Sequence, residues 1–232
     1  MHNFLKRIIP QILFDKYRNI RIQLSCFKIL AVEQGQFRTI RTKTCVDAMN
    51  NEIPWYTYPA IAYLEQIDTK EKRIFEWGSG NSSIWWARKS KEVVSAEDDK
   101  VWFEKNLNNL LGNQQLLLFE EESNYVSAIA GEDKVYDIII IDGNYRFKCA
   151  QQAISQLSNN GMIILDNSDW FPKTTKFLRD QGLIQVDFSG FGPINSYAWV
   201  TSIFLSRQFD FMPAFHVQPT HCVGGLVSNA ED

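Results

Sequence analysis

The sequence predicts an α/β fold built on a doubly wound, mostly parallel sheet. From residue 73 onward, short apolar segments alternate with helical segments, which is the pattern of strand–helix–strand units. The segment at residues 136–142, YDIIIID, is apolar throughout, as expected of a strand that is buried on both faces. The last two strand segments follow one another without a helix, so we expect an antiparallel hairpin at the edge of the sheet.

The composition is that of a globular chain. Its 232 residues suffice for one full domain with an appendage, and 45% hydrophobic and 22% charged residues exclude disordered, collagen-like and coiled-coil classes. The sequence has no run of about 18 apolar residues and no signal-peptide core at its start. The four cysteines lie far apart without a CxxC pair, which indicates free thiols in a reducing compartment. We therefore expect a cytoplasmic protein.

Charge is distributed unevenly along the chain. Residues 1–43 carry nine Lys and Arg against Asp15 and Glu33, whereas the whole chain has a net charge of −3. Apolar side chains are interleaved with these basic residues, so residues 1–35 are a candidate contact for an anionic membrane. The alternative is a solvated helix that packs on an acidic body. We expect no nucleic-acid partner.

The segment before residue 71 is irregular in pattern. We expect a helix, a short strand, a turn and a second helix, at residues 11–33, 37–45, 48–54 and 58–66. The first helix follows from apolar residues at helical spacing, namely Leu13, Tyr17, Ile20, Leu24, Phe27 and Ala31. Residues 20–26 also alternate like a strand, which leaves that assignment open. The chain divides into a basic N-terminal extension and lid at 1–70, an α/β domain at 71–210 and a C-terminal tail at 211–232.

The α/β domain contains seven expected strands. They lie at residues 73–77, 92–97, 114–120, 136–142, 161–166, 183–188 and 197–207. Helices are expected at 82–90, 98–111, 147–157 and 172–182, with a short helix or turn at 124–131. Ser82 or Ser83 is a candidate N-cap for the first of these helices, and the NNG at 159–161 is a stop signal for the third.

A glycine-containing loop follows the first strand. In FEWGSGNSS, at residues 75–83, Gly78 and Gly80 allow the backbone to approach a ligand closely, and the next helix presents its N-terminal N–H groups there. Glu97 ends the second strand, 19 residues after Gly78. An acid at this place accepts hydrogen bonds from a ribose diol, although it is equally a favourable acid before the following helix. Together the two features predict a nucleoside site.

Two cofactors compete for this site. A nicotinamide-binding loop has a third glycine, where this chain has Ser83. Glu76 lies directly before the glycines and its carboxylate opposes a pyrophosphate, whereas it suits a ligand with an ammonium group. Both residues favour S-adenosylmethionine over NAD.

Residues 73–206 resemble the class I S-adenosylmethionine-dependent methyltransferases. The matching motifs are EWGSG (76–80), SAEDD (95–99), YDIIIIDG (136–143), GMIILDN (161–167) and the closing strand pair. The resemblance implies a Rossmann-like, seven-stranded sheet whose last strand is antiparallel. It also implies that Glu76, Gly78 and Gly80 line the methionine part of the cofactor, Glu97 its ribose and Asp142 the edge near its methyl group. The full set of expected cofactor contacts adds Ser79, Asn81, Ser82 and Asp98.

The acidic residues after the fourth and fifth strands indicate a possible metal site. Asp142, Asp166 and Asn167 would meet if these two strands are neighbours, and their oxygens suit Mg²⁺ or Ca²⁺. The arrangement is similar to the catechol-type O-methyltransferases, where such a metal lowers the pKa of the acceptor hydroxyl. This chain lacks their lysine three residues after the Asp. The alternative is that both acids only end their strands.

Neighbouring residues are candidates for the catalytic step. Arg146 would clamp an acidic group of the substrate, or else pair with Asp142 or Asp169. Tyr145 is a candidate general base, although its ordinary pKa is high for that role. Trp170 and Phe171 offer rings for stacking an acceptor or for packing a lid.

Three tryptophans fall inside expected helices. Trp85, Trp86 and Trp102 are therefore predicted to lie in the core.

The sequence thus predicts an S-adenosylmethionine-dependent methyltransferase that acts on an oxygen or nitrogen of a small-molecule or saccharide acceptor. The alternatives are an NAD(P)-dependent oxidoreductase and a non-catalytic nucleoside-binding protein of the same fold.

Overall fold

The computed structural model describes residues 11–130 and 135–226. Predictions that fall on residues 1–10, on Gly131 or on 227–232 lie outside the described residues. The strands are β1 (Arg73–Trp77), β2 (Glu92–Glu97), β3 (Gln114–Leu118), β4 (Tyr136–Ile141), β5 (Leu157–Leu165), β6 (Ile184–Gly190) and β7 (Trp199–Leu205). The helical segments are α2 (Gln11–Lys28), η1 (Ile29–Glu33), α3 (Gln36–Thr42), α4 (Tyr58–Leu64), α5 (Asn81–Ala87), α6 (Lys100–Leu107), α7 (Glu122–Ser127), η2 (Ala128–Ala130), α8 (Arg146–Gln156), η3 (Ser168–Trp170) and α9 (Pro172–Asp180).

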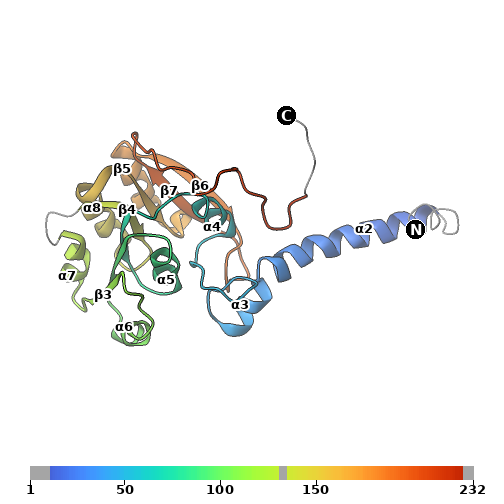
Figure 1. Cartoon of the computed structure of the whole chain (residues 1–232), viewed down its shortest axis with the longest axis horizontal. Helices are drawn as coiled ribbons and strands as arrows, with labels where there is room; N and C mark the ends of the chain where they lie inside the picture. The colour runs from blue at the N-terminus through green and yellow to red at the C-terminus, as the bar shows by residue number, and fades with distance from the viewer. Residues whose placement is uncertain (1–10, 131–134, 227–232) are drawn as a thin grey trace.

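The seven strands form one sheet in the order β3-β2-β1-β4-β5-β7-β6 (Figure 1). Strands β1 to β5 are parallel, and β7 runs antiparallel to both β5 and β6. The predicted fold class and the antiparallel edge pair are therefore confirmed. Strand β1 pairs with β2 on one side and β4 on the other. The helices after β1 and β4, α5 and α8, pack on opposite faces of the sheet, which places a crevice at the carboxyl ends of the strands.

Apolar side chains cover both faces of the sheet. On β4, Ile138 and Ile140 pack into one core cluster, together with Leu64 and Trp86 from the helices α4 and α5. The intervening β4 residues, among them Ile139, join a second cluster with side chains of α7, α8 and α9. This alternation confirms that the isoleucine run is a strand that is buried on both sides.

Residues 37–45 do not form a strand. Helix α3 occupies Gln36–Thr42 instead, and it lies between Gly35 and Lys43, which both adopt left-handed conformations. Its Thr39 is fully buried and accepts a hydrogen bond from the backbone N–H of Ile194. Contacts with residues distant in sequence therefore override the strand propensity of this segment. Residues 20–26, whose spacing also suits a strand, belong to helix α2.

Other element boundaries also differ from the prediction. The NNG sequence does not end α8; it lies within β5, where a Cβ on Gly161 would come within 2.6 Å of the Asp137 carbonyl oxygen. The N-cap of α5 is Gly80 rather than Ser82 or Ser83, and its N–H donates to Ser83 Oγ at 3.1 Å. Trp85 and Trp86 are buried as expected, but Trp102 is 41% exposed.

The N-terminal segment has two structurally different parts. Residues 45–67 pack on the sheet, with Tyr56, Ala60 and Leu64 fully buried. Helix α2 instead projects away from the sheet and its covering helices, and η1 and α3 lie at its base (Figure 1). No helix among the described residues is long and apolar enough to cross a membrane.

Candidate cofactor and acceptor site

A cavity of about 480 Å³ opens at the carboxyl ends of β1, β2, β4 and β5. Most residues singled out from the sequence line it, namely Glu76, Gly78, Ser79, Ser82, Glu97, Asp98, Asp142, Arg146, Asp166 and Asn167. Of the residues expected to bind the cofactor or to act in catalysis, Gly80, Asn81 and Tyr145 lie outside this lining. The strand order explains the convergence, because parallel neighbouring strands end at the same edge of the sheet.

Glu76 is 1% exposed and holds its carboxylate in a cage of hydroxyl groups. Ser82 Oγ donates to Oε2 at 3.2 Å, and Ser95 Oγ donates to Oε1 at 2.6 Å. Ser83 Oγ also donates to Oε1. Burial raises the pKa of Glu76 from 4.5 to about 7, and the three hydroxyls oppose that rise. Glu76 also lines the cavity, where a cationic ligand group would compensate its charge.

This raised pKa predicts a pH-dependent stability in the ligand-free protein. The folded state holds the Glu76 proton more tightly than the unfolded state, so the stabilisation is complete below pH 4.5 and is lost as pH rises to about 7. The loss amounts to about 3 kcal/mol. Urea unfolding across this range measures it, and the Glu76→Gln variant should have a shallower slope. An equal slope in both proteins would contradict the assigned pKa.

Two loops meet tightly below the cavity. Gly78 has a φ of 97°, and a Cβ there would lie 3.3 Å from the Gly143 nitrogen. A Cβ on Gly143 would lie 2.0 Å from the Tyr125 hydroxyl. Gly78 therefore lets two backbones pack together, because a Cβ there would meet the loop after β4. Sequence reasoning missed Gly143, although a glycine directly after a strand-ending acid is a usable signal.

Glu97 ends β2 and is 5% exposed. Its Oε1 accepts the backbone N–H groups of Asp98 and Asp99 at 3.1 and 3.0 Å, and its Oε2 accepts Ser79 Oγ at 2.7 Å. Burial raises the pKa of Glu97, and these hydrogen bonds oppose the rise. The carboxylate is thus fixed on the cavity wall beside the glycine loop.

Trp102 lines the same cavity as Glu97. Its Nε1 donates to the Ser79 carbonyl at 2.5 Å, so the indole holds the glycine loop in place. Asn144 Nδ2 donates to Asp98 Oδ2 at 2.8 Å and links the loops after β2 and β4. The predicted core position of Trp102 is therefore wrong, because its indole lines the cavity instead.

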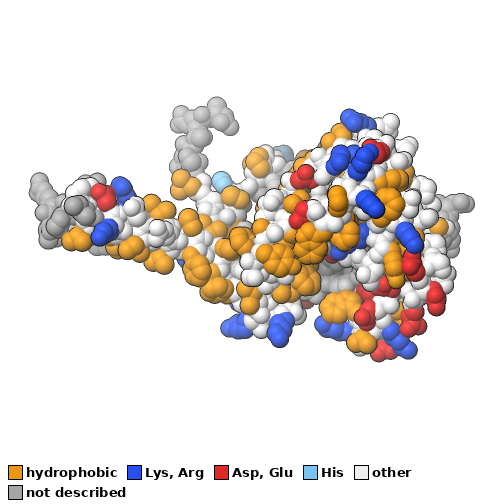
Figure 2. Space-filling view, turned by 180° about the vertical axis from the view of Figure 1, so that it is seen from behind, with side chains coloured by type: hydrophobic (Ala, Val, Ile, Leu, Met, Phe, Trp, Pro, Cys, Tyr) orange, Lys and Arg blue, Asp and Glu red, His pale blue; other side chains and the backbone are white. Residues whose placement is uncertain are grey.

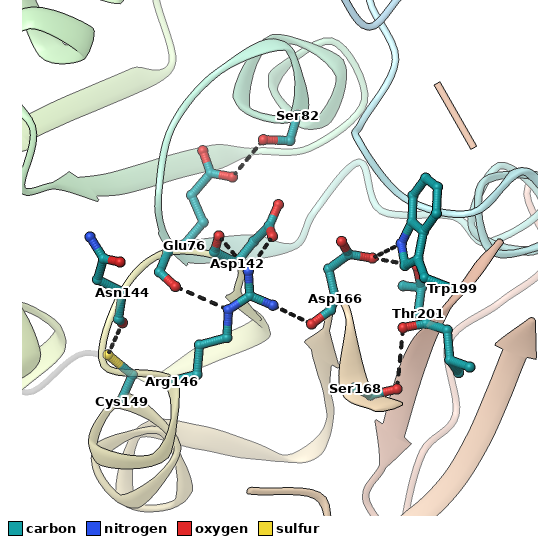
Figure 3. A network of polar contacts seen from close by, with 12 residues as sticks. Glu76, Ser82, Asp142, Asn144, Arg146, Cys149, Asp166, Ser168, Trp199 and Thr201 are labelled. Carbon is teal, nitrogen blue, oxygen red and sulfur yellow. Dashed lines mark hydrogen bonds and ion pairs between the residues drawn. The ribbon is translucent and has the colours of Figure 1, made fainter. Parts of the chain in front are cut away.

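Arg146 occupies the gap between the ends of β4 and β5 (Figure 3). Its Nε donates to the Gly143 carbonyl at 3.0 Å, and its Nη2 donates to both the carbonyl and Oδ1 of Asp142 at 3.1 Å. Nη1 donates to the Asp166 carbonyl. The guanidinium has five N–H groups, and it makes four hydrogen bonds to protein oxygens. Arg146 therefore braces the site and pairs with Asp142, which confirms one of the two expected ion pairs; no ion pair with Asp169 is seen among the described residues. The substrate clamp stays a prediction.

The predicted cation site does not fit this arrangement. Asp142, Asp166 and Asn167 all line the cavity, but the Arg146 guanidinium lies between the first two and brings its own positive charge. One oxygen of Asp166 is already used by Trp199 and Thr201. Within the described ranges, no group of three or more His, Cys, Asp or Glu is placed to hold a metal ion. We derive no step through Mg²⁺.

Asp166 is the most deeply buried acid on this side of the cavity, at 3% exposure. Its Oδ1 accepts Trp199 Nε1 at 3.0 Å and Thr201 Oγ1 at 2.5 Å. Figure 3 shows the other carboxylate oxygen on the side of Asp142. Burial raises the pKa of Asp166, and the nearby charge of Asp142 raises it further. Burial also raises the pKa of Asp142, against the opposing effect of Arg146.

Tyr145, the predicted general base, lies outside the cavity lining. It adopts a left-handed conformation before α8, and its ring packs edge-on against Tyr125 at 6.2 Å. Phe171 also lies outside the cavity lining, where it packs under the Arg146 guanidinium at 4.6 Å. Exposed aromatic rings do line the acceptor side, namely Trp55, Trp170 and Tyr197.

The segment before α4 is tied to this side of the cavity. The Thr57 N–H donates to Thr201 Oγ1 at 3.0 Å, and that hydroxyl donates in turn to Asp166. Gln36 Nε2 donates to the carbonyl of Asn195, a cavity residue, at 2.7 Å. Sequence reasoning missed Thr201. The pairing of Leu165 with Ser202 brings Thr201 opposite Asp166, and this register is not readable from either strand alone.

Comparison with solved structures identifies the fold. The chain superposes on precorrin-6y C5,15-methyltransferase from Geobacter metallireducens GS-15 with a TM-score of 0.50 and 15% identity, over 64% of this chain and 87% of that one. The chain has the Rossmann-like methyltransferase fold. A putative caffeoyl-CoA O-methyltransferase from Staphylococcus aureus aligns with 20% identity and a TM-score of 0.46, over 58% of this chain and 76% of that one.

A third methyltransferase-fold structure was solved with S-adenosylhomocysteine bound. This putative methyltransferase from Streptococcus mutans aligns with 12% identity and a TM-score of 0.46, over 61% of this chain and 92% of that one. No family model and no curated protein matches the sequence. At these identities the likeness concerns the methyltransferase fold alone, and function has to be argued from the site.

Proposed function

We propose that this protein transfers the methyl group of S-adenosylmethionine to an oxygen or nitrogen of a small-molecule or saccharide acceptor. The observation that carries the proposal is a single cavity with two fixed carboxylates, Glu76 and Glu97, at the ends of β1 and β2. The same cavity continues to Asp142 and Asp166 beyond them. One ligand can therefore contact the first pair while its far end faces the second.

The first pair of carboxylates fits the cofactor. Glu76 suits the ammonium of its methionine part, because an opposite charge compensates a buried carboxylate. Glu97 suits the ribose diol, which can take over the Ser79 hydroxyl's place on Oε2.

We assign to Asp166 the role of the base that accepts the acceptor's proton. S-Adenosylmethionine supplies a sulfonium-bound methyl group, which passes to a lone pair of the acceptor while the sulfur keeps the bonding electrons. The acceptor's proton goes to Asp166 Oδ2, since Oδ1 is held by Trp199 and Thr201. A raised pKa makes this carboxylate a more effective base near neutral pH than an ordinary aspartate. The remaining contribution is proximity and orientation.

The lining of the acceptor side favours a ring with polar substituents. Trp55, Trp170 and Tyr197 offer faces for stacking, and Asn167 and Asn195 offer amide groups for hydrogen bonds. The carboxylates of Asp142 and Asp166 favour hydroxyl or amine groups over an acidic group. This combination supports a saccharide or a small aromatic or amine acceptor. A pyrophosphate cofactor is disfavoured, because it would face the caged carboxylate of Glu76.

The Glu97→Ala variant should bind S-adenosylmethionine about 1–3 kcal/mol more weakly, because it loses the hydrogen bonds to the ribose. Isothermal titration calorimetry measures the difference. Glu104→Ala is the matched control, since Glu104 is an exposed acid outside the cavity on the neighbouring helix α6. Equal affinity of the Glu97→Ala and wild-type proteins would contradict the placement of the ribose.

A further inference from the structure

We call residues 11–43 the arm, which comprises α2, η1 and α3. The arm exposes an apolar stripe. Five of its residues recur at alternating spacings of four and three and therefore share one helix face, namely Leu13, Tyr17, Ile20, Leu24 and Phe27. Each of them is 53–60% exposed, which is unusual for large apolar side chains. Figure 2 shows apolar side chains along the whole arm. Among the described residues, Phe37 of α3 contacts the stripe at Phe27, and the five stripe side chains remain more than half exposed.

Basic side chains border this stripe. Lys16, Arg21 and Lys28 each stand next in sequence to a stripe residue and so lie along its flanks. The two acidic residues of the arm already form ion pairs within it. Asp15 pairs with Arg18 at 3.2 Å, and Glu33 pairs with Lys28 at 3.0 Å. Within the described part of the chain, Lys16 and Arg21 make no ion pair, so their charges remain available to a partner.

A groove at the base of the arm also combines apolar and basic side chains. It encloses about 630 Å³ between η1 and α3, with apolar walls that include Val32, Phe37 and Ile40. Arg38 and Arg41 line the same groove and make no ion pair with any described residue. Phe37 packs edge-on against Phe27 at 5.5 Å, so the groove is continuous with the stripe.

We propose that the arm docks on an anionic lipid bilayer. An apolar stripe with basic flanks matches a helix that lies in the membrane interface, where acyl chains receive the stripe and the basic side chains reach anionic headgroups. The groove then offers an apolar surface and two guanidinium groups to a single lipid. This proposal is independent of the proposed methyl transfer, because the stripe and the groove share no residue with the cavity.

A second copy of this chain is the competing occupant. The stripe has the spacing of a coiled-coil seam, but Lys16, Arg21 and Lys28 hold the positions that flank such a seam. In a self-pair Lys16 and Arg21 would lie at the seam without acidic partners among the described residues of the arm, which is unfavourable. Charge complementarity therefore favours an anionic surface.

Vesicle flotation of the full chain tests the proposal. We expect binding to vesicles rich in phosphatidylserine at low salt, little binding to pure phosphatidylcholine, and release in about 1 M salt, where charges are screened over about 3 Å. Lys16→Glu/Arg21→Glu should lower the partition coefficient at least 20- to 30-fold. Leu24→Asp should also lose binding, because it places a charge in the stripe.

The matched control is Lys91→Glu/Lys173→Glu, which changes the net charge equally at exposed lysines outside the arm. It should keep nearly all vesicle binding, and all variants should keep the circular dichroism of the wild type. Absence of binding to phosphatidylserine at low salt, or an equal loss in the control, would overturn the proposal. So would a wild-type dimer in sedimentation equilibrium that Leu24→Asp dissociates while vesicles are not bound.

Discussion

The Asp166→Asn variant should lose turnover by about 10²- to 10⁴-fold, the usual contribution of a general base. The amide oxygen can still accept from Trp199 and Thr201, so the fold around the site is kept while the proton acceptor is removed. The readout is the formation of S-adenosylhomocysteine with an acceptor found in a panel of saccharides, amines and phenols. Affinity for S-adenosylmethionine, measured by calorimetry, should be largely retained.

A second readout does not depend on the acceptor. Because burial raises the pKa of Asp166 from 3.8 to about 8 in the folded protein, its carboxyl group stabilises the fold fully below pH 3.8, and this contribution is lost as pH rises to about 8. Asp166→Asn should therefore melt at a higher temperature than the wild type at high pH, with a smaller difference in acid.

The control for Asp166→Asn is Asp169→Asn. This residue also hydrogen-bonds through a carboxylate oxygen, to the Val200 N–H at 3.1 Å, but it lies outside the cavity lining. It should retain turnover. Equal turnover in Asp166→Asn and the wild type would remove Asp166 from the proposed mechanism.

Arg146→Ala should destabilise the protein by about 3–5 kcal/mol, because it leaves the partly buried carboxylate of Asp142 without its cation. It also removes the donors to three carbonyl groups at the ends of β4 and β5. Urea unfolding at neutral pH measures the loss. Arg146→Lys should recover only part of it, since one ammonium group cannot reach acceptors arranged around a planar guanidinium.

A double variant separates the two causes. If the stranded carboxylate dominates the loss, Arg146→Ala should cost less in an Asp142→Asn background than in the wild type. Arg207→Ala, which removes an exposed arginine with one carbonyl contact, should have a small effect. An Arg146→Ala protein as stable as Arg207→Ala would show that Arg146 does not brace the strand ends.

The strands of the sheet could be predicted because their pattern and their burial agree. The run of four isoleucines in β4 needs helices on both faces, and the sequence supplies them. The predicted strand at residues 37–45 is wrong for the opposite reason. Their local pattern suits a strand, but Gly35 and Lys43 turn the chain at both ends of a short helix. The contact that decides, between Thr39 and Ile194, is distant in sequence.

The acids of the site were predictable and their partners were not. Glu76, Glu97, Asp142 and Asp166 each end or nearly end a parallel strand, so strand order alone brings them to one edge. The function of Arg146 depends on backbone carbonyls, which carry no signature in the sequence. Local spacing therefore suggested a substrate clamp and a cation site where the structure has an internal brace.

The most direct test of the account is calorimetric titration of the wild-type protein with S-adenosylmethionine, S-adenosylhomocysteine and NAD under one set of conditions. The proposed roles of Glu76 and Glu97 predict that the first two ligands bind and that NAD does not, because a pyrophosphate would face the Glu76 carboxylate. Tight binding of NAD, without a response to the other two ligands, would contradict the proposed function.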